Sequence, residues 1–350
     1  MPEPLDDHYN LVMRRITEGD LVPFLGAGAN MCGRPENESW RQGQYLPNGG
    51  ELATFLAQNY GYPPRVLKLD CPTCHKEVRG NEKALDLLRV SQYAGLQGGE
   101  GDLYKDLHKL FNADYPPTSL HQFLASLPAA LVKKGFPKRG LLVVTTNYDD
   151  LMERAFIQAG EVFDVLTYVA KGDGRGTFLH WPPDGPPRAI TEPNKYTAIS
   201  LDERSVVLKI HGAVNRSDGN QDSYVIREDD YIDYLARTTE INGVLPVTVV
   251  DKLKNSHLLF LGYSLSDWNL RVILHRIWEQ RKFDFKSWAV QLRPEPIDQK
   301  FWSKRDVDIL DVRLEEYVEA LEARLKATPQ VADTAASAAQ HFEQSGGPHA

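Results

Sequence analysis

The sequence predicts an α/β fold with a Rossmann-like, mostly parallel sheet, helices on both faces and a helical small lobe. Two observations carry this prediction. Short apolar segments typical of buried strands alternate with segments of helical periodicity. Glycine or polar motifs directly follow four of the predicted strands. Because ligands of parallel sheets bind at the carboxyl ends of the strands, these motifs predict where a site is built.

The predicted strands are short runs of apolar and β-branched residues. They cover residues 21–25, 141–146, 206–210, 258–261, 287–292 and 307–312. The predicted helices have apolar residues at helical spacing. They cover residues 6–19, 51–60, 81–95, 103–111, 119–127, 148–159, 267–280 and 314–325. Thr118 or Ser119 is the expected N-cap of the fifth of these helices.

We expect one domain over residues 1–327 with two additions. A mainly helical insertion occupies about 51–135, and a Gly- and Pro-rich excursion containing a β-hairpin occupies about 165–205. Residues 328–350 are rich in Ala, Ser, Gln and Gly, and this composition predicts a disordered tail.

The composition narrows the class of protein. With 42% hydrophobic and 25% charged residues the chain is typical of globular proteins. We expect neither a membrane span nor a secretory signal, because there is no run of eighteen apolar residues and the N-terminus is acidic. The odd count of three cysteines fits the cytoplasm. The net charge of -8 argues against direct sequence-specific nucleic-acid binding, and the basic residues between 133 and 139 are interpreted as a solvated loop.

The first motif is Gly26-Ala27-Gly28-Ala29-Asn30, at the end of the first strand. Glycines let a backbone approach a pyrophosphate, and N–H groups at the start of the next helix bind its charge. A tight strand-to-helix turn without a ligand would have the same sequence. The motif lacks the third glycine of G-x-G-x-x-G and an acidic partner about twenty residues on, which disfavours a standard dehydrogenase fold.

Polar residues also follow two later strands. The run Thr145-Thr146-Asn147-Tyr148-Asp149 offers five side chains that could hydrogen-bond a sugar; alternatively, Thr146 or Asn147 only caps the next helix. His211 lies between a strand and Gly212. Imidazole is the natural general base near neutral pH, although a lone histidine is more often structural.

The fourth motif, Gly262-Tyr-Ser-Leu-Ser-Asp-Trp-Asn269, joins a strand to a helix. Its backbone and the Ser264 hydroxyl could hold a ribose or a phosphate. The alternative is that Ser266 or Asp267 caps the helix.

Taken together, these motifs resemble the sirtuin-like NAD-binding fold in the right order, over roughly residues 15–325. The resemblance rests on Gly26–Asn30, Thr145–Asp149 with Glu153-Arg154-Ala155, Lys209–Gly212 and Gly262–Asn269. It is closest to bacterial sirtuin-like NAD hydrolases of antiphage defence, for which the form of residues 262–267 is typical. Deacetylases have Ser-Gly-Ile-Pro-Asp-Phe-Arg after the glycine loop and Gln at the position of Thr146, whereas this chain has Cys32-Gly-Arg-Pro35.

The resemblance implies that NAD is the substrate, with Asn147 and His211 as the catalytic pair. It also implies NAD contacts from Gly26, Ala27, Gly28, Ala29, Asn30, Thr146, Asp149, Gly262, Ser264 and Asp267. The expected reaction is cleavage of the nicotinamide–ribose bond to nicotinamide and ADP-ribose, by a gated effector of antiphage defence (abortive infection) that depletes NAD. Such relatives imply a homo-oligomer and a separate sensor or ATPase/helicase chain. The alternatives are an NAD-dependent protein deacylase and a non-catalytic module that senses NAD or ADP-ribose.

No metal is expected. Deacetylases hold a structural zinc with two Cys-x-x-Cys pairs, whereas this chain has one pair, Cys71 and Cys74, followed by His75. Two neutral thiols in a loop are the prediction, and a zinc site completed by His75 or a distant histidine is the alternative.

Overall fold

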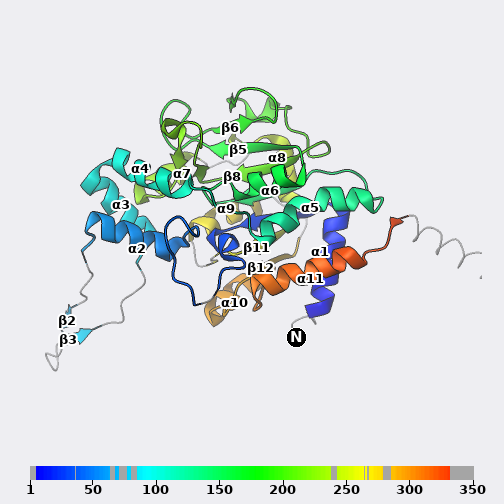
Figure 1. The fold of residues 1–350 in the computed structure, drawn as a ribbon, viewed down its shortest axis with the longest axis horizontal. Coiled ribbons are helices and arrows are strands. Elements are labelled where there is room, and N and C mark those ends of the chain that lie inside the picture. The colour runs from blue at the N-terminus through cyan, green and yellow to red at the C-terminus, as the bar shows by residue number, and fades with distance from the viewer. Residues whose placement is uncertain are drawn as a thin grey trace, which may run out of the picture.

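A nine-stranded sheet forms the centre of the molecule (Figure 1). The computed structural model describes residues 5–35, 37–63, 68–70, 77–79, 85–237, 243–263, 265, 268–278 and 285–331. The strand order is β13-β12-β11-β1-β4-β8-β5-β6-β7. These strands are β1 (Leu21–Leu25), β4 (Leu142–Thr145), β5 (Phe163–Tyr168), β6 (Phe178–Trp181), β7 (Arg188–Ile190), β8 (Ser205–Lys209), β11 (His257–Leu261), β12 (Ser287–Val290) and β13 (Val307–Leu310).

All neighbouring pairs from β13 to β5 are parallel, whereas the pairs β5–β6 and β6–β7 at the edge of this sheet are antiparallel. The predicted mostly parallel α/β fold is therefore confirmed. Two small antiparallel pairs accompany the sheet: β2 (Lys68–Asp70) with β3 (Glu77–Arg79), and β9 (Gly212–Ala213) with β10 (Ser223–Tyr224).

Helices cover both faces of the sheet and form a lobe beside it. They are α1 (Leu5–Glu18), α2 (Gly49–Tyr60), α3 (Leu87–Gly98), α4 (Glu100–Phe111), α5 (Ser119–Lys133), α6 (Leu151–Ala159), α7 (Glu228–Arg237), α8 (Val247–Lys254), α9 (Trp268–Trp278), α10 (Pro296–Ser303) and α11 (Leu314–Ala327). Helices α1, α5, α6 and α11 pack on one face with Leu21 and Leu25 of β1. Helices α8 and α9 pack on the other face with Val22 and Phe24. Since side chains alternate along a strand, β1 contributes to both cores and is buried throughout.

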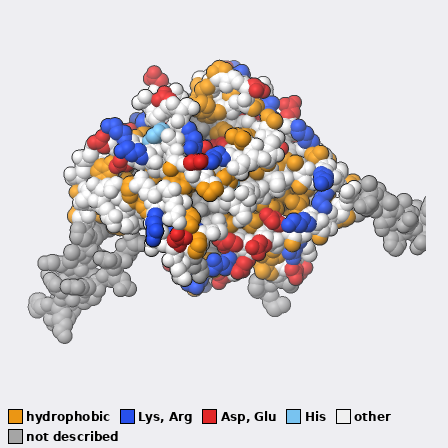
Figure 2. All heavy atoms as spheres, in the orientation of Figure 1, with side chains coloured by type: hydrophobic (Ala, Val, Ile, Leu, Met, Phe, Trp, Pro, Cys, Tyr) orange, Lys and Arg blue, Asp and Glu red, His pale blue; other side chains and the backbone are white. Residues whose placement is uncertain are grey.

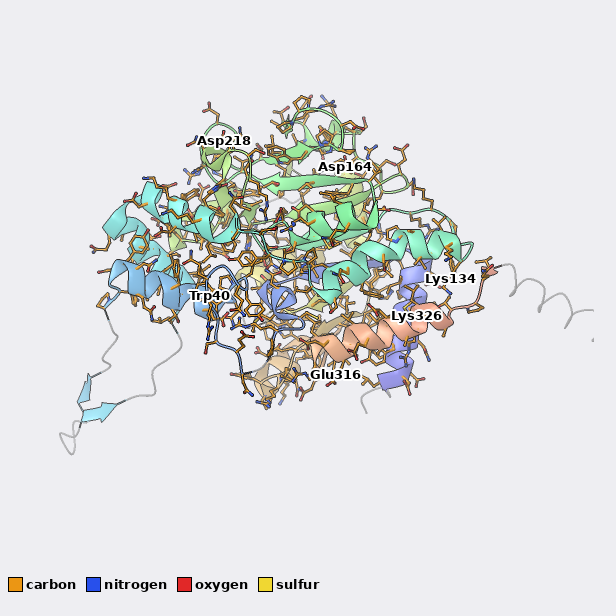
Figure 3. The ribbon with its side chains drawn as sticks, in the orientation of Figure 1. Trp40, Lys134, Asp164, Asp218, Glu316 and Lys326 are labelled. Atoms are coloured by element: carbon orange, nitrogen blue, oxygen red, sulfur yellow. The ribbon has the colours of Figure 1, made fainter. Side chains whose placement is uncertain are left out.

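A third apolar core lies in the helical lobe, which Figure 1 shows beside the sheet as α2, α3 and α4. Helix α5 falls within the range expected for the helical insertion, but it packs on the sheet with α1, α6 and α11. Its N-cap is Thr118, as predicted. At its other end Lys134, marked in Figure 3 near Lys326, donates through Nζ to the carbonyl oxygens of Lys326 and Thr328. The last helix is thereby held against α5.

The sequence analysis did not predict β5, which lies in the sheet where the Gly- and Pro-rich excursion was expected to begin. Its second residue, Asp164 (labelled in Figure 3), interrupts the apolar pattern expected of a buried strand, because a charged residue occupies a fully buried position. That carboxylate accepts hydrogen bonds from His180 Nε2 at 2.9 Å and Arg204 Nε at 2.8 Å. The expected hairpin is present as β6 and β7, paired antiparallel onto β5.

Helices α7, α8 and α10 were also not predicted. Helix α7 buries only Asp230 and Tyr234 among its ten residues and has an acidic first turn, so few apolar residues mark it in the sequence. The predicted tail lies largely outside the described residues, which end at Val331.

Candidate functional site

The loops after β1, β4, β8 and β11 surround a cavity of about 430 Å³. Sites for small molecules and cofactors commonly have volumes of roughly 300–1,000 Å³. Nine predicted site residues line it: Gly26, Ala27, Gly28, Asn30, Thr146, Asn147, Asp149, His211 and Gly262. Ala29 instead is fully buried in the core under α1 and α5. Ser264 and Asp267 lie outside the described residues.

The glycine loop after β1 turns directly into a short 3₁₀ helix, Ala27–Met31. Its N–H groups are largely used within the protein. Gly26 N–H donates to Leu261 O at 3.1 Å, and Gly28 N–H donates to Gly262 O at 2.8 Å. Ala29 N–H donates to Gly26 O at 2.9 Å. The expectation that this loop presents a row of N–H groups to a pyrophosphate is therefore not met at these three positions.

The same glycines are required by the close approach of two loops. A Cβ atom on Gly28 would lie 2.7 Å from Gly262 O, and one on Gly26 would lie 2.6 Å from the same oxygen. A Cβ atom on Gly262, whose φ is +65°, would lie 2.1 Å from Ala29 N. The loops after β1 and β11 thus form one backbone-packed unit at the seam where the chain order of the strands reverses, which is where doubly wound folds bind ligands.

The loop after β4 is fixed by hydrogen bonds to the glycine loop. Thr145 Oγ1 donates to Leu25 O at 3.1 Å, and Asn147 Nδ2 donates to Gly26 O at 3.0 Å. Because that carbonyl can only accept, the amide nitrogen of Asn147 must face it. The side-chain Oδ1 of Asn147 is then the atom that can accept a hydrogen bond from a ligand.

Helix α6 begins at Leu151 with Asp150 as its N-cap, so neither Thr146 nor Asn147 caps it. Asp149 Oδ1 accepts a hydrogen bond from Leu151 N–H at 3.1 Å. Its Oδ2 accepts from Asn30 Nδ2 at 2.7 Å. The carboxylate is 4% exposed and links both loops at the cavity wall.

A buried ion pair lies behind this loop. Lys209 is 1% exposed, and its Nζ donates to Glu153 Oε1 at 2.8 Å and to the carbonyl oxygen of Asp149. Burial raises the pKa of Glu153, and the Lys209 ammonium opposes that rise. Glu153 Oε2 is buried without a hydrogen-bond partner in the described part of the chain. Lys209 therefore fixes the backbone at the end of the loop that carries Asn147.

His211 is held between two tyrosines of α7. Its ring centroid lies 5.1 Å from that of Tyr231 and 5.6 Å from that of Tyr234, both edge-on. Nδ1 lies 3.3 Å from Tyr231 Oη, and Nε2 has no hydrogen-bond partner among the residues that the structure describes. Burial lowers the pKa of His211 to about 3, so the imidazole is neutral at pH 7. A neutral imidazole can act as a base.

One family model matches part of the chain. The family model of the SIR2-like domain matches residues 141–310. This part of the chain is therefore similar to the SIR2-like family. The match includes Asn147, His211 and Gly262, whereas the glycine loop Gly26–Asn30 precedes the matched residues and follows β1 in the middle of the sheet.

Curated relatives include bacterial defence proteins. The chain is 23% identical over 316 residues to "Defense-associated sirtuin 2" of Bacillus subtilis, which is 88% of this chain and 25% of that protein. It is 27% identical over 197 residues to "NAD(+) hydrolase ThsA" of Acinetobacter baumannii (56% of this chain, 32% of that protein). A protein of the same name from Cytobacillus dafuensis is 26% identical over 196 residues (56% and 31%). The aligned region spans only about a quarter to a third of the length of these relatives.

The sequence analysis missed cavity residues that come from the helical lobe and α7. Asn48, Gly49 and Gly50 at the start of α2 line the cavity, as does Tyr231. Asn48 and Glu51 form a capping box, and the spacing Asn-x-x-Glu is a recognisable signal of a helix start. No comparable signal marks Tyr231, because its role depends on where α7 packs.

A second cavity, of about 640 Å³, lies across the glycine loops from the first. Gly28, Gly262 and Tyr263 line both cavities. The rest of its wall comes from the segment after the 3₁₀ helix and from the loops after β12 and β13, including Arg34, Glu38, Arg313 and Glu315. Polar and charged groups therefore surround a space that adjoins the first cavity at Gly28, Gly262 and Tyr263.

The alternative zinc site would involve Cys71, Cys74 and His75, which lie outside the described residues. Within the described ranges, no group of three or more His, Cys, Asp or Glu side chains is arranged to hold a metal ion. Cys32 is buried with Sγ 3.3 Å from Ser119 Oγ, and burial raises the pKa of its thiol.

No helix in the described ranges is long and apolar enough to cross a membrane. On the face drawn in Figure 2, acidic and basic side chains are interspersed.

Proposed function

We propose that this SIR2-like domain is an NAD⁺ glycohydrolase that acts in antiphage defence by depleting NAD. The observation that carries the proposal is the convergence of Asn147 and His211 on one cavity with the two packed glycine loops. A relative named as an NAD(+) hydrolase supports the reaction, and one named as a defence-associated sirtuin supports the role in defence.

The reaction breaks the bond between the ribose C1′ and the pyridinium nitrogen of NAD. The electron pair of that bond moves to the ring, and neutral nicotinamide departs without being protonated. An oxocarbenium-like ribose remains, and a water oxygen forms the new bond to C1′ while losing a proton. The products are nicotinamide, ADP-ribose and a proton, so the enzyme must orient the ribose, stabilise a cation and accept that proton.

The side chains around the cavity suit these tasks. Asn147 Oδ1 accepts a hydrogen bond from a ribose hydroxyl or the attacking water, since its amide nitrogen is bound to Gly26 O. His211 Nε2 accepts the proton of that water or of a ribose hydroxyl, since the neutral ring leaves a lone pair available. The Asp149 carboxylate lies in the same wall and stabilises positive charge at C1′.

The two adjoining cavities suggest how the dinucleotide lies. The nicotinamide ribose occupies the first cavity beside Asn147 and His211, and the adenosine occupies the second, beyond Gly28 and Gly262. The pyrophosphate then crosses the glycine loops, with Ser264 and Asp267 in the following segment as further contacts. The start of α2, at Gly49 and Gly50, adds the positive end of a helix dipole to the first cavity.

Unrestrained NAD hydrolysis would kill the host, so the proposal includes gating. We propose a cytoplasmic homo-oligomer that is triggered through a separate sensor or ATPase/helicase chain, with no metal required.

The test is incubation of the purified protein with NAD, followed by chromatography for nicotinamide and ADP-ribose. Asn147→Ala and His211→Ala should each lower the rate by about two or more powers of ten, as expected for a positioned acid–base group. Asn220→Ala and His275→Ala, at exposed positions, are the matched controls and should keep full activity. Full activity in both cavity variants would refute the site assignment.

Two other results would indicate a different function for the domain. Formation of acetyl-ADP-ribose from an acetyl-lysine peptide and NAD would make the domain a deacylase. Tight NAD or ADP-ribose binding without turnover, measured by calorimetry with and without candidate activators, would make it a sensing module.

A further inference from the structure

We propose that Tyr231 is a positioning residue that fixes the tautomer of His211. In this proposal the Tyr231 hydroxyl oxygen accepts a hydrogen bond from Nδ1–H of the imidazole, so the lone pair remains on Nε2. The catalytic consequence rests on the proposed function, whereas the tautomer is a property of the protein without substrate.

Among the residues that the structure describes, Tyr231 Oη is the hydrogen-bond partner of His211 Nδ1. Tyr231 Oη lies 3.3 Å from Nδ1, and its ring stands at 80° to the imidazole. Tyr234 covers the ring at 85° from the same helix. His211 is only 2% exposed, so water does not compete freely for its nitrogens. The orientation of the imidazole is therefore set by α7 and not by solvent.

The direction of the hydrogen bond follows from the other ring nitrogen. Nε2 is buried and has no acceptor near it among the described residues. If Nε2 carried the proton, it would be an orphaned donor, and orphaned buried N–H groups are rarer in proteins than under-satisfied acceptors. Placing the proton on Nδ1 gives that donor an acceptor in Tyr231 Oη. The lone pair of the proposed base then lies on Nε2, which no described residue engages.

Helix α7 is itself anchored, which makes Tyr231 a fixed reference for His211. Asp230 Oδ2 accepts hydrogen bonds from Ile226 N–H at 3.3 Å and Arg227 N–H at 2.9 Å. Ser91 Oγ of α3 donates to Ile226 O at 2.8 Å. Gln92 Nε2, also on α3, donates to Asp229 at 2.7 Å. The helical lobe thus holds the helix that orients the proposed base.

The deciding experiment is nitrogen-15 NMR of the full chain with labelled histidine, without NAD. The signals of His211 are identified by their loss in His211→Gln. The two ring nitrogens have distinct chemical shifts when protonated and when not, so the spectrum reads the tautomer directly. We expect protonated Nδ1 and unprotonated Nε2 at pH 7. A spectrum with the proton on Nε2 overturns the proposal, whether or not the protein hydrolyses NAD.

Tyr231→Phe adds a kinetic test with a matched control. It should lower kcat by about 3- to 10-fold, the effect of one neutral hydrogen bond, and change KM for NAD by less than about 2-fold. Its spectrum should show increased protonation of Nε2. Tyr168→Phe removes another buried hydroxyl, one without a hydrogen-bond partner in the described part of the chain, and should leave both readouts unchanged. A Tyr231→Phe protein that keeps the wild-type tautomer, or that raises KM with kcat unchanged, refutes the positioning role.

Discussion

Replacing Lys209 by Met would isolate the role of the buried ion pair behind the catalytic loop. The substitution keeps the aliphatic volume but removes the ammonium that contacts Glu153 Oε1 at 2.8 Å and the carbonyl of Asp149. Removing one partner of a buried pair typically costs about 3–5 kcal/mol. At about 2 °C per kcal/mol, the lower end for large domains, the melting temperature should fall by about 6–10 °C.

The pH dependence separates charge burial from lost packing. The pKa of Glu153 is already raised by burial, and without Lys209 it rises further. Between the unfolded and the folded pKa the native state binds the extra proton, so stability falls as pH rises through that window. Lys209→Met should therefore cost more at pH 8 than at pH 5, in urea unfolding followed by fluorescence. Lys209→Met combined with Glu153→Gln should lose this pH dependence.

The matched control is an exposed ion pair with the same distance between its nitrogen and oxygen atoms. Lys195 Nζ lies 2.8 Å from Glu192 Oε1, with side chains 75% and 66% exposed. Lys195→Met should change the free energy of unfolding by less than about 1 kcal/mol. A Lys209→Met protein as stable as this control, or one equally destabilised at both pH values, would refute the reasoning.

Two further predictions concern the loops and the buried histidines. Gly262→Ala should abolish NAD binding, measured by calorimetry, because its Cβ would lie 2.1 Å from Ala29 N. Gly33→Ala is the control, since Gly33 also has a positive φ (+85°) but a Cβ there would meet no atom within 4 Å. It should lower the free energy of unfolding by only about 1 kcal/mol and keep NAD binding. Burial lowers the pKa of His8 to about 4 and of His211 to about 3 in the folded protein. As pH drops below about 6.5, the unfolded state therefore binds protons that the folded state does not, and the free energy of unfolding should fall. Urea unfolding at pH 7 and pH 5 should differ by up to about 2 kcal/mol for each of these histidines, and equal stability would contradict their burial as neutral groups.

The sequence predicts much of the site because parallel strands bring their carboxyl ends together. Asn147 and His211 were each ambiguous as single residues, yet both lie on one cavity because β4 and β8 are neighbours. The glycines are a different case. The sequence indicated contact with a phosphate, whereas packing against the loop after β11 already requires them. A glycine motif cannot distinguish these causes, since both need a close backbone approach.

Two features could not be predicted from the sequence, strand β5 and the role of Tyr231, because both depend on contacts between distant elements. Asp164 interrupts the apolar pattern of β5, and only its pairing with Arg204 and His180 explains how a charge is accommodated there. Tyr231 belongs to a helix with a largely polar sequence, and its contact with His211 follows from the anchoring of α7 on α3. Neither pairing leaves a periodic signature along the chain.

The central position of β1 also determines when the site can exist during synthesis. This strand is made before both of its neighbours, since Leu21 pairs with His257 and Phe24 pairs with Val144. Until those residues have left the ribosome, an apolar segment lacks both neighbours and is a target for chaperones. Closing contacts of such sequence separation is slow. Since Gly262 completes the cavity wall, a nascent chain that ends before β11 has no assembled site. The order of synthesis thus delays the proposed toxic activity until β11 and Gly262 have been translated.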